Sequence, residues 1–494
     1  MADLSLIQNG SPMTIRQQIV LTAKLSLPAI MAQLSNILMQ YIDASMVGQL
    51  GTNPSAAVGL VGTSLWLFWG VCSAMTVGFT VQVAHKIGAR QNGDARSILR
   101  QSFTSVTLFS IFITAIGLII GPFLPYWLGG GDEIAGMSST YFMIFIVSLP
   151  GLSLSYLAGG MLRCAGNMKV PSILNSLMAV LDICFNWFLI FPTRSISFAG
   201  MEITVPGADL GVAGAAIGTV LAELVTAGAM IYFLVYKEDS LKLKGTTGSF
   251  LPDRKVIFKA LKISVPMALE HAVICGAQIM ITVIVAPLGV IAIAANSFAV
   301  TAESLCYMPG YGIGDAATTL VGQSHGAGRR DLTRRFGYIT VGMGMAVMSF
   351  MGVLMWIFAP YMMELMSPVP EISSLGTEIL RIEAWAEPMF AAAIVSYGVF
   401  VGVGDTLVPA CMNFSSIWLV RLPLAAILAP IIGLRGVWIA MCVELSFRGL
   451  IFLIRLKGRK WTSKTGNENI KTEIREYENI ENEDSIIGSG KDLF

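Results

Sequence analysis

The sequence predicts an all-α membrane protein of twelve transmembrane helices, arranged as two six-helix bundles. Composition, the number of hydrophobic runs and an internal repeat predict this fold class. The chain of 494 residues is 54% hydrophobic and 13% charged, with a mean hydropathy of +0.70. Soluble proteins carry roughly 25% charged residues. We therefore expect an integral membrane protein, and the net charge of +1 gives no indication of a nucleic-acid partner.

Twelve hydrophobic runs are counted at about 20 apolar residues per crossing. Six precede and six follow the longest polar connection, KEDSLKLKGTTGSFLPDRK, which we interpret as a linker between two lobes. The expected spans are 18–48, 56–83, 102–128, 138–162, 170–193, 211–236, 257–286, 290–322, 336–366, 374–401, 407–431 and 434–456. The expected divisions are a cytoplasmic N-terminus over 1–16, a first lobe over 17–236, a cytoplasmic linker over 237–256, a second lobe over 257–461, and a polar, disordered cytoplasmic tail over 462–494.

The two lobes repeat with a shift of 238 residues. Five of the seven prolines from Pro28 to Pro192 have a proline 238 residues later, although only 20 of 494 residues are proline. The matched pairs are Pro28 and Pro266, Pro122 and Pro360, Pro150 and Pro388, Pro171 and Pro409, and Pro192 and Pro430. This pattern indicates an internal duplication. An even number of spans per copy makes both copies enter the membrane from the same side. It thus predicts a pseudo-two-fold axis along the membrane normal, a central cleft and a secondary transporter.

Charged loops predict the orientation. Lys and Arg gather after the second, fourth, sixth and eighth spans, whereas the alternate loops carry few basic residues. By the positive-inside rule, both termini and the linker face the cytoplasm of a multi-pass plasma-membrane protein. The seven cysteines have no metal-ligand spacing, so we expect neither a disulfide framework nor a bound cofactor.

The first span carries a polar stripe. Gln33, Asn36, Gln40 and Asp43 lie at i, i+3, i+7 and i+10, which is one face of a helix. An acid at membrane depth is costly and usually faces a bundle interior or a wet cavity. Asp43 is therefore the first candidate functional residue, and Asn36 and Gln40 are candidates for the substrate cleft. The alternative is that Asp43 lies near the aqueous end of its helix and pairs with a neighbour.

The fifth and sixth spans offer further oxygen ligands. Asp182 and Asn186 are one turn apart on the fifth span, and Thr219 lies on the sixth. Together with Asp43 they form a possible ligand set for a hard monovalent cation such as Na⁺, or for a proton shared by two acids. Alternatively, Asn186 and Thr219 satisfy neighbouring backbone groups.

The second lobe does not copy this polar chemistry. Ile281, Val420 and Leu424 stand at the counterparts of Asp43, Asp182 and Asn186. Its own polar residues are expected to line the substrate cleft: Glu270, His271 and Gln278 on the seventh span, and Asn296 and Glu303 on the eighth. Glu270 could equally be a hydrated or paired acid near the cytoplasmic end.

Three further groups in the last spans are ionisable. Glu444 and Arg448 are an i, i+4 pair, for which structural ion pairing is expected. Glu383 and Glu387 share the same spacing on the tenth span, and no role is assigned to either.

Several motifs resemble elements of the multidrug and toxic compound extrusion (MATE) family. They are IDASMVGQLG, GADLGVAGAAIGTVLAE, VGQSHGAGRRD, FVGVGDTLVP and VRLPLAAILAP with GLRGVWIA, and the likeness runs from about residue 16 to Trp461. The resemblance implies a V-shaped pair of six-helix bundles that exports organic cations and drugs in exchange for Na⁺ or H⁺. It also implies a transporter rather than an enzyme, functional as a monomer.

The resemblance also implies a first-lobe cation site. The family's first-span Asp matches Asp43, and its sixth-span Thr matches Thr219. The family's fifth-span Asn and Asp appear here in reverse order, as Asp182 and then Asn186. Val401 stands where the family usually has an Arg before the Gly-Asp-Thr element.

Two other functions are weighed against drug efflux. A lipid-linked glycan flippase shares the wider architecture, but it would be expected to hold a diphosphate with several basic residues, and the intramembrane ones here are few, chiefly Arg381, Arg421 and Arg448. A polytopic enzyme such as a prenyl transferase would need clustered carboxylates around Mg²⁺. The sequence has no such cluster, which makes this alternative the weaker one.

Overall fold

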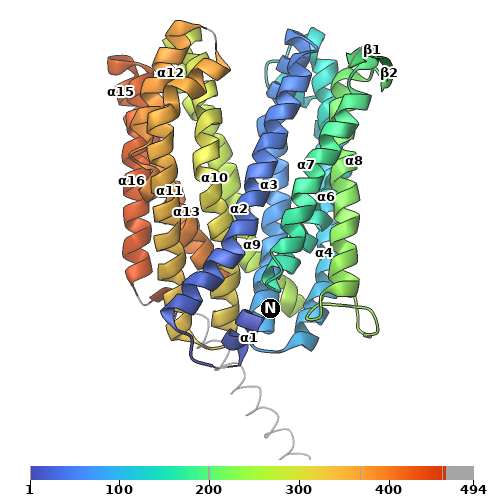
Figure 1. Ribbon diagram of the computed structural model, residues 1–494, viewed down its shortest axis with the longest axis vertical. Helices are drawn as coiled ribbons and strands as arrows, with labels where there is room; N and C mark the ends of the chain where they lie inside the picture. The colour runs from blue at the N-terminus through green and yellow to red at the C-terminus, as the bar shows by residue number, and fades with distance from the viewer. Residues whose placement is uncertain (1, 10, 199–200, 368, 459, 463–494) are drawn as a thin grey trace, which may run out of the picture.

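The computed structural model describes residues 2–9, 11–198, 201–367, 369–458 and 460–462. From residue 463 on, the expected tail lies outside the described residues. Long helices run roughly parallel in two bundles (Figure 1). Helices suit a lipid-embedded chain because each one satisfies its backbone hydrogen bonds internally.

The first lobe contains the helices encoded before the linker. They are α2 (Ile15–Gly48), α3 (Thr52–Gly88), α4 (Asn92–Ile120), α5 (Leu124–Trp127), α6 (Asp132–Cys164), α7 (Lys169–Leu189) and α8 (Gly211–Tyr232), which a π-helical turn, η1 (Phe233–Lys237), continues. A short helix, α1 (Ala2–Gln8), precedes them within the stretch predicted as a polar terminus. Leu4 and Ile7 of α1 are buried, because they pack into the core of the second lobe.

The second lobe contains the helices after the linker. They are α9 (Arg254–Val285), η2 (Ala286–Leu288), α10 (Val290–Gly326), α11 (Arg330–Met366), α12 (Pro370–Glu383), α13 (Glu387–Gly402), α14 (Leu407–Ser416), η3 (Ile417–Arg421), α15 (Leu422–Ile432), α16 (Leu434–Lys457) and η4 (Lys460–Thr462).

The predicted spans correspond to these helices. Ten helices of the described chain are long and apolar enough to cross a membrane, and α12 with α13 forms an eleventh span with a 60° bend. Helix α2 is the twelfth: it has 34 residues, and its polar stripe lowers its hydropathy.

A two-stranded antiparallel hairpin, β1 (Pro192–Phe198) and β2 (Met201–Ala208), connects α7 and α8. It lies at the opposite end of the molecule from α1 (Figure 1). We call these the hairpin end and the linker end. The sequence analysis treated the hairpin as a loop, because it falls between two stronger hydrophobic runs.

The lobes meet through elements that the repeat exchanges. Helix α2 packs on α10, and its repeat counterpart α9 packs on α3, the counterpart of α10. At the linker end a Cβ on Gly88 would lie 2.0 Å from the carbonyl oxygen of Gln323, and a Cβ on Gly326 would lie 2.0 Å from that of His85. The 238-residue shift converts the first contact into the second. We call these four residues the glycine seam.

Hydrogen bonds across the seam follow the same symmetry. His85 Nε2 lies 2.8 Å from the Gly402 carbonyl oxygen, and Gln323 Nε2 donates to the Cys164 carbonyl oxygen at 2.6 Å. The shift again relates the two bonds. The duplicated sequence therefore closes the linker end with two copies of one contact, made without any side chain at the glycines.

Candidate functional site

The polar residues predicted from α2 and α7 meet inside the first lobe. The side-chain amide of Asn186 donates to Asp43 Oδ1 at 2.9 Å and to Asp182 Oδ2 at 3.2 Å. Asp182 and Asn186 are fully buried. The two carboxyl groups lie close enough to interact directly, so one proton could bridge them. The structure thus brings together three of the four residues predicted to bind the coupling cation.

The fourth residue, Thr219 of α8, adjoins the same group. Its hydroxyl donates to the Ala215 carbonyl oxygen at 3.1 Å, which matches the alternative role weighed for it. It also lies within interaction range of Asp182. Thr219 can therefore contribute a hydroxyl oxygen to the site while its proton stays on the backbone of α8.

Close approach of α7 and α8 depends on small residues. A Cβ on Gly218 would lie 2.1 Å from Asn186 Oδ1, and a Cβ on Gly214 would lie 2.4 Å from the Leu189 carbonyl oxygen. Glycines spaced four residues apart are a common means of bringing membrane helices together. Gly218 therefore creates the space that Asn186 occupies.

Glu223 was missed by the sequence analysis. It lies one turn beyond Thr219 on α8 and interacts electrostatically with Asp182 and Asp43. Its Oε2 atom is buried without a hydrogen-bond partner. An acid within the sixth span, one turn from an assigned residue, was the signal that could have identified it.

The first-lobe site can accept a small cation. Asp182 Oδ1 and Asn186 Oδ1 are both buried and have no hydrogen-bond partner. Buried polar atoms without partners are unfavourable, so these oxygens favour either a bound Na⁺ or a proton on the acids. Both carboxylate and amide oxygens are suitable ligands for a hard cation.

A second polar region lies between the lobes. A cavity of about 390 Å³ is lined by residues of both lobes, including Glu270 and His271 from the predicted cleft set. Glu270 accepts hydrogen bonds from the Tyr397 hydroxyl, at 2.5 Å, and from the Asn413 amide. The paired role weighed for Glu270 is therefore the one that the structure displays.

The other predicted cleft residues lie elsewhere. Gln40 and Gln278 are exposed, and Asn36 is half-buried. Asn296 accepts a hydrogen bond from Trp438 Nε1 at 2.9 Å, and Glu303 is buried near Arg421. Asn296 and Glu303 thus point into the second lobe and do not line the cavity between the lobes.

The predicted ion pair between Glu444 and Arg448 is confirmed. The guanidinium binds both carboxylate oxygens at 2.8 Å, and Ser416 adds a hydroxyl donor at 2.5 Å. Both side chains are buried.

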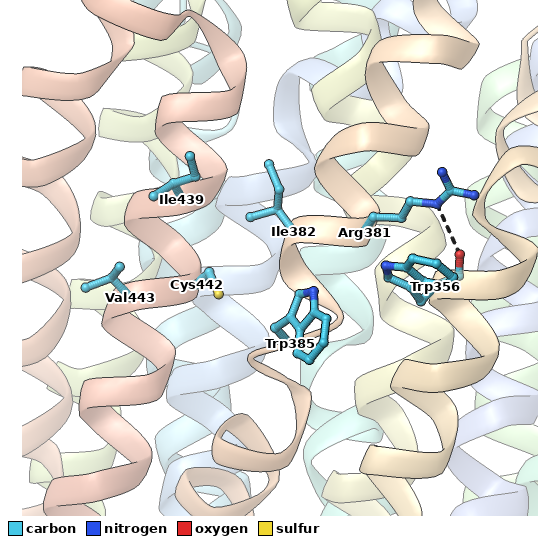
Figure 2. A pocket seen from close by; sticks show the side chains of 7 residues that line it. All are labelled: Trp356, Arg381, Ile382, Trp385, Ile439, Cys442 and Val443. Carbon is cyan, nitrogen blue, oxygen red and sulfur yellow. Dashed lines mark hydrogen bonds between the residues drawn. The ribbon is translucent and has the colours of Figure 1, made fainter.

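A groove of about 420 Å³ runs along the outer wall of the second lobe. Figure 2 shows it between α11, α12 and α16, with Arg381 Nε donating to the Trp356 carbonyl oxygen at 3.3 Å. Trp385 in this groove is 76% exposed. Its residues face outward from the bundle, so the groove is separate from both polar regions.

Comparison with known proteins gives a consistent result. The MatE family model matches residues 28–188 and again residues 266–427, two segments that begin 238 residues apart. A probable multidrug resistance protein NorM of Thermotoga maritima is 26% identical over 454 residues, covering 91% of this chain and 94% of that protein.

Two solved structures share the fold. The Vibrio cholerae MATE transporter VcmN in its bent form has a TM-score of 0.79 at 18% identity, covering 91% of this chain and 98% of that one. A multidrug resistance MATE family transporter in an outward-facing conformation has a TM-score of 0.81 at 20% identity, covering 92% and 98%. The predicted arrangement of two helical lobes is therefore confirmed.

Proposed function

Because the chain belongs to the MatE family, we infer that it is a multidrug efflux transporter, and we propose that it exports organic cations in exchange for Na⁺ or H⁺. The relatives named as multidrug resistance proteins support the first part. The observation that carries the second part is the buried group of Asp43, Asp182 and Asn186, with two oxygens left without partners.

Competition for negative charge couples the two fluxes. When the acids are free of ion, their charge favours a cationic substrate in the space between the lobes. When Na⁺ or a proton binds, it neutralises Asp43 and Asp182 and weakens the hold on that substrate. An inward-moving monovalent ion gains roughly 2.3 kcal/mol per 100 mV of membrane potential.

The lobes rock about the membrane normal to expose the substrate to each side in turn. The glycine seam is the contact that must break for the linker end to open, since Gly88 and Gly326 each pack directly on backbone of the other lobe. Its contacts involve no charged pair, so closing and opening require no exchange of strong ionic bonds.

The orientation follows from the distribution of basic residues: the linker end faces the cytoplasm, and both termini lie on that side of the plasma membrane. Each chain contains a first-lobe site and a cavity between its own lobes, which is consistent with function as a monomer. No cofactor besides the coupling ion enters the proposal, and the lipid bilayer is the other expected partner.

Inverted membrane vesicles test the coupling ion. Uptake of a fluorescent organic cation is measured under a Na⁺ gradient alone and then under an H⁺ gradient alone. We expect transport under one of the two gradients and its loss when that gradient is collapsed. Absence of transport under both would contradict ion-coupled export and favour the lipid-linked glycan flippase.

A further inference from the structure

Four glutamates from different parts of the second lobe converge in its interior. Glu303 of α10 is 5% exposed, and Glu383 of α12, Glu387 of α13 and Glu444 of α16 are fully buried. We call them the second-lobe acidic cluster. They lie in the other lobe from Asp43 and Asp182, and the proposed exchange mechanism does not use them.

The charged and titratable groups that face this cluster come from three elements. Within the described chain they are Cys306, Tyr307 and Tyr311 of α10, Arg421 of η3, and Cys442 and Arg448 of α16. Helix α11 contributes Gly352, against which the Glu387 side chain packs. Only the two arginines of this set are cations.

Two arginines cannot balance four carboxylates. Arg448 is already bound through two hydrogen bonds to Glu444. Arg421 interacts electrostatically with Glu303 and Glu383, and it donates one hydrogen bond to the sulfur of Met441. If Arg421 balances one further carboxylate, two acids remain without a counter-charge.

Glu383 and Glu387 are the two acids left over. All four of their carboxyl oxygens are buried and have no hydrogen-bond partner. A buried carboxylate without an ion pair or a donor is strongly unfavourable, and such a group takes up a proton instead. No group of three or more His, Cys, Asp or Glu side chains in the described chain is arranged to hold a metal ion, which favours protons over a metal.

We propose that Glu383 and Glu387 form a second proton-binding site, in which each carboxyl group carries one proton. Glu383 is the last residue of α12 and Glu387 is the first of α13, so the two acids flank the 60° bend of the tenth span. Pro388 follows directly, and its missing N–H and its restriction on the preceding residue explain why the helix breaks here.

The position of the site links its protons to the bend. The neighbouring side chains Arg381, Ile382 and Trp385 face the outer groove (Figure 2), whereas Glu383 turns into the lobe. On the inner side, Gly352 leaves little room: a Cβ there would lie 2.9 Å from the Ala384 carbonyl oxygen and 3.1 Å from Glu387 Cβ. Loss of a proton would place an unbalanced charge in this confined space, so either the bend must change or Arg421 must reorient.

Infrared spectroscopy of the full chain in lipid nanodiscs tests the proposal directly. Protonated carboxyl groups have a C=O stretch separate from that of carboxylates. At pH 7 we expect the protonated band to lose two carboxyl equivalents in the double variant Glu383→Gln and Glu387→Gln. The control Glu378→Gln should lose none, because Glu378 is an exposed acid paired with Arg435. An unchanged band in the double variant would overturn the proposal.

Two further variants keep the test decisive. If the glutamine variants do not fold, Glu383→Asp and Glu387→Asp retain the acid and should shift the band in frequency; no shift in either would contradict the proposal. In Asp43→Asn the signal from Glu383 and Glu387 should persist. The result therefore does not depend on whether the first-lobe site couples transport.

Discussion

Asn186 connects the two acids of the first lobe, because one side-chain amide donates to both Asp43 and Asp182. An amide group has two N–H donors, so both are used here and its oxygen remains available. The order Asp182 then Asn186 therefore still forms a closed group, although the resemblance to the MATE family implies the reverse order. The carboxylate has moved by one turn, and the amide now bridges from its position to the acid on α2.

Gly218→Ala should disrupt this group without a change of charge. The added methyl would lie 2.1 Å from Asn186 Oδ1 and must displace the amide. We expect ion-driven efflux to fall about tenfold or more, equivalent to roughly 1.4 kcal/mol in the transport barrier. Gly228→Ala is the matched control on the same helix, because it has open space around it. Equal efflux in both variants would mean that the position of Asn186 does not matter.

Glu444→Gln should destabilise the second lobe. It leaves Arg448 buried without its ionic partner, which typically costs about 3–5 kcal/mol. Glu378→Gln removes an exposed partner of Arg435 and should cost about 0–1 kcal/mol. Thermal unfolding of both variants in the same detergent checks the difference. Similar melting temperatures would contradict a stabilising role for the buried pair.

Among single residues, the sequence could predict those that lie on one helical face within a span. Asp43, Asp182 and Asn186 were found this way. Glu223, Glu383 and Glu387 received no role, because their significance depends on which helices meet. Periodicity shows the face of a helix but does not show its neighbour, and Asn296 and Glu303 were assigned to the cleft for the same reason.

Two helices of the repeat differ although their sequences match in proline. Pro150 lies inside the continuous helix α6, whereas its counterpart Pro388 follows the break between α12 and α13. The prolines could therefore reveal the duplication but could not predict the bend. A proline removes one hydrogen bond in either case, and the surrounding packing decides whether the helix stays continuous.

Gly88→Ala and Gly326→Ala should each hold the linker end open. Either methyl would lie 2.0 Å from a carbonyl oxygen of the other lobe, so the glycine seam could no longer close. We expect Cys164, buried at the seam in the native chain, to react with a small maleimide at least several-fold faster. Mass spectrometry of labelled peptides distinguishes Cys164 from the exposed Cys184 and Cys411.

Gly93→Ala and Gly342→Ala are controls in the first and second lobes, since both glycines have open space around them. The repeat symmetry makes a further demand: the two seam variants should behave alike. A change in only one of them would contradict a symmetric closing contact.

For the molecule as a whole, hydropathy and the repeat predicted the twelve spans and the two lobes. A bilayer requires long apolar helices, so their number can be read from the sequence. Helix α1 and the hairpin were missed, because neither spans the membrane and both depend on local packing. The duplication supplied two similar scaffolds, on which different acids now lie: Asp43 and Asp182 in one lobe, and the acidic cluster in the other.

The most direct test of ion-coupled export compares Asp43→Asn with the native chain in inverted vesicles, under whichever ion gradient drives transport. Asp132→Asn, an exposed acid at the start of α6, serves as the control for loss of one negative charge. We predict that the native chain and the control accumulate a fluorescent cation at similar rates, while Asp43→Asn falls to the level of vesicles without transporter. Accumulation by Asp43→Asn at the native rate would contradict the assignment of the first-lobe site.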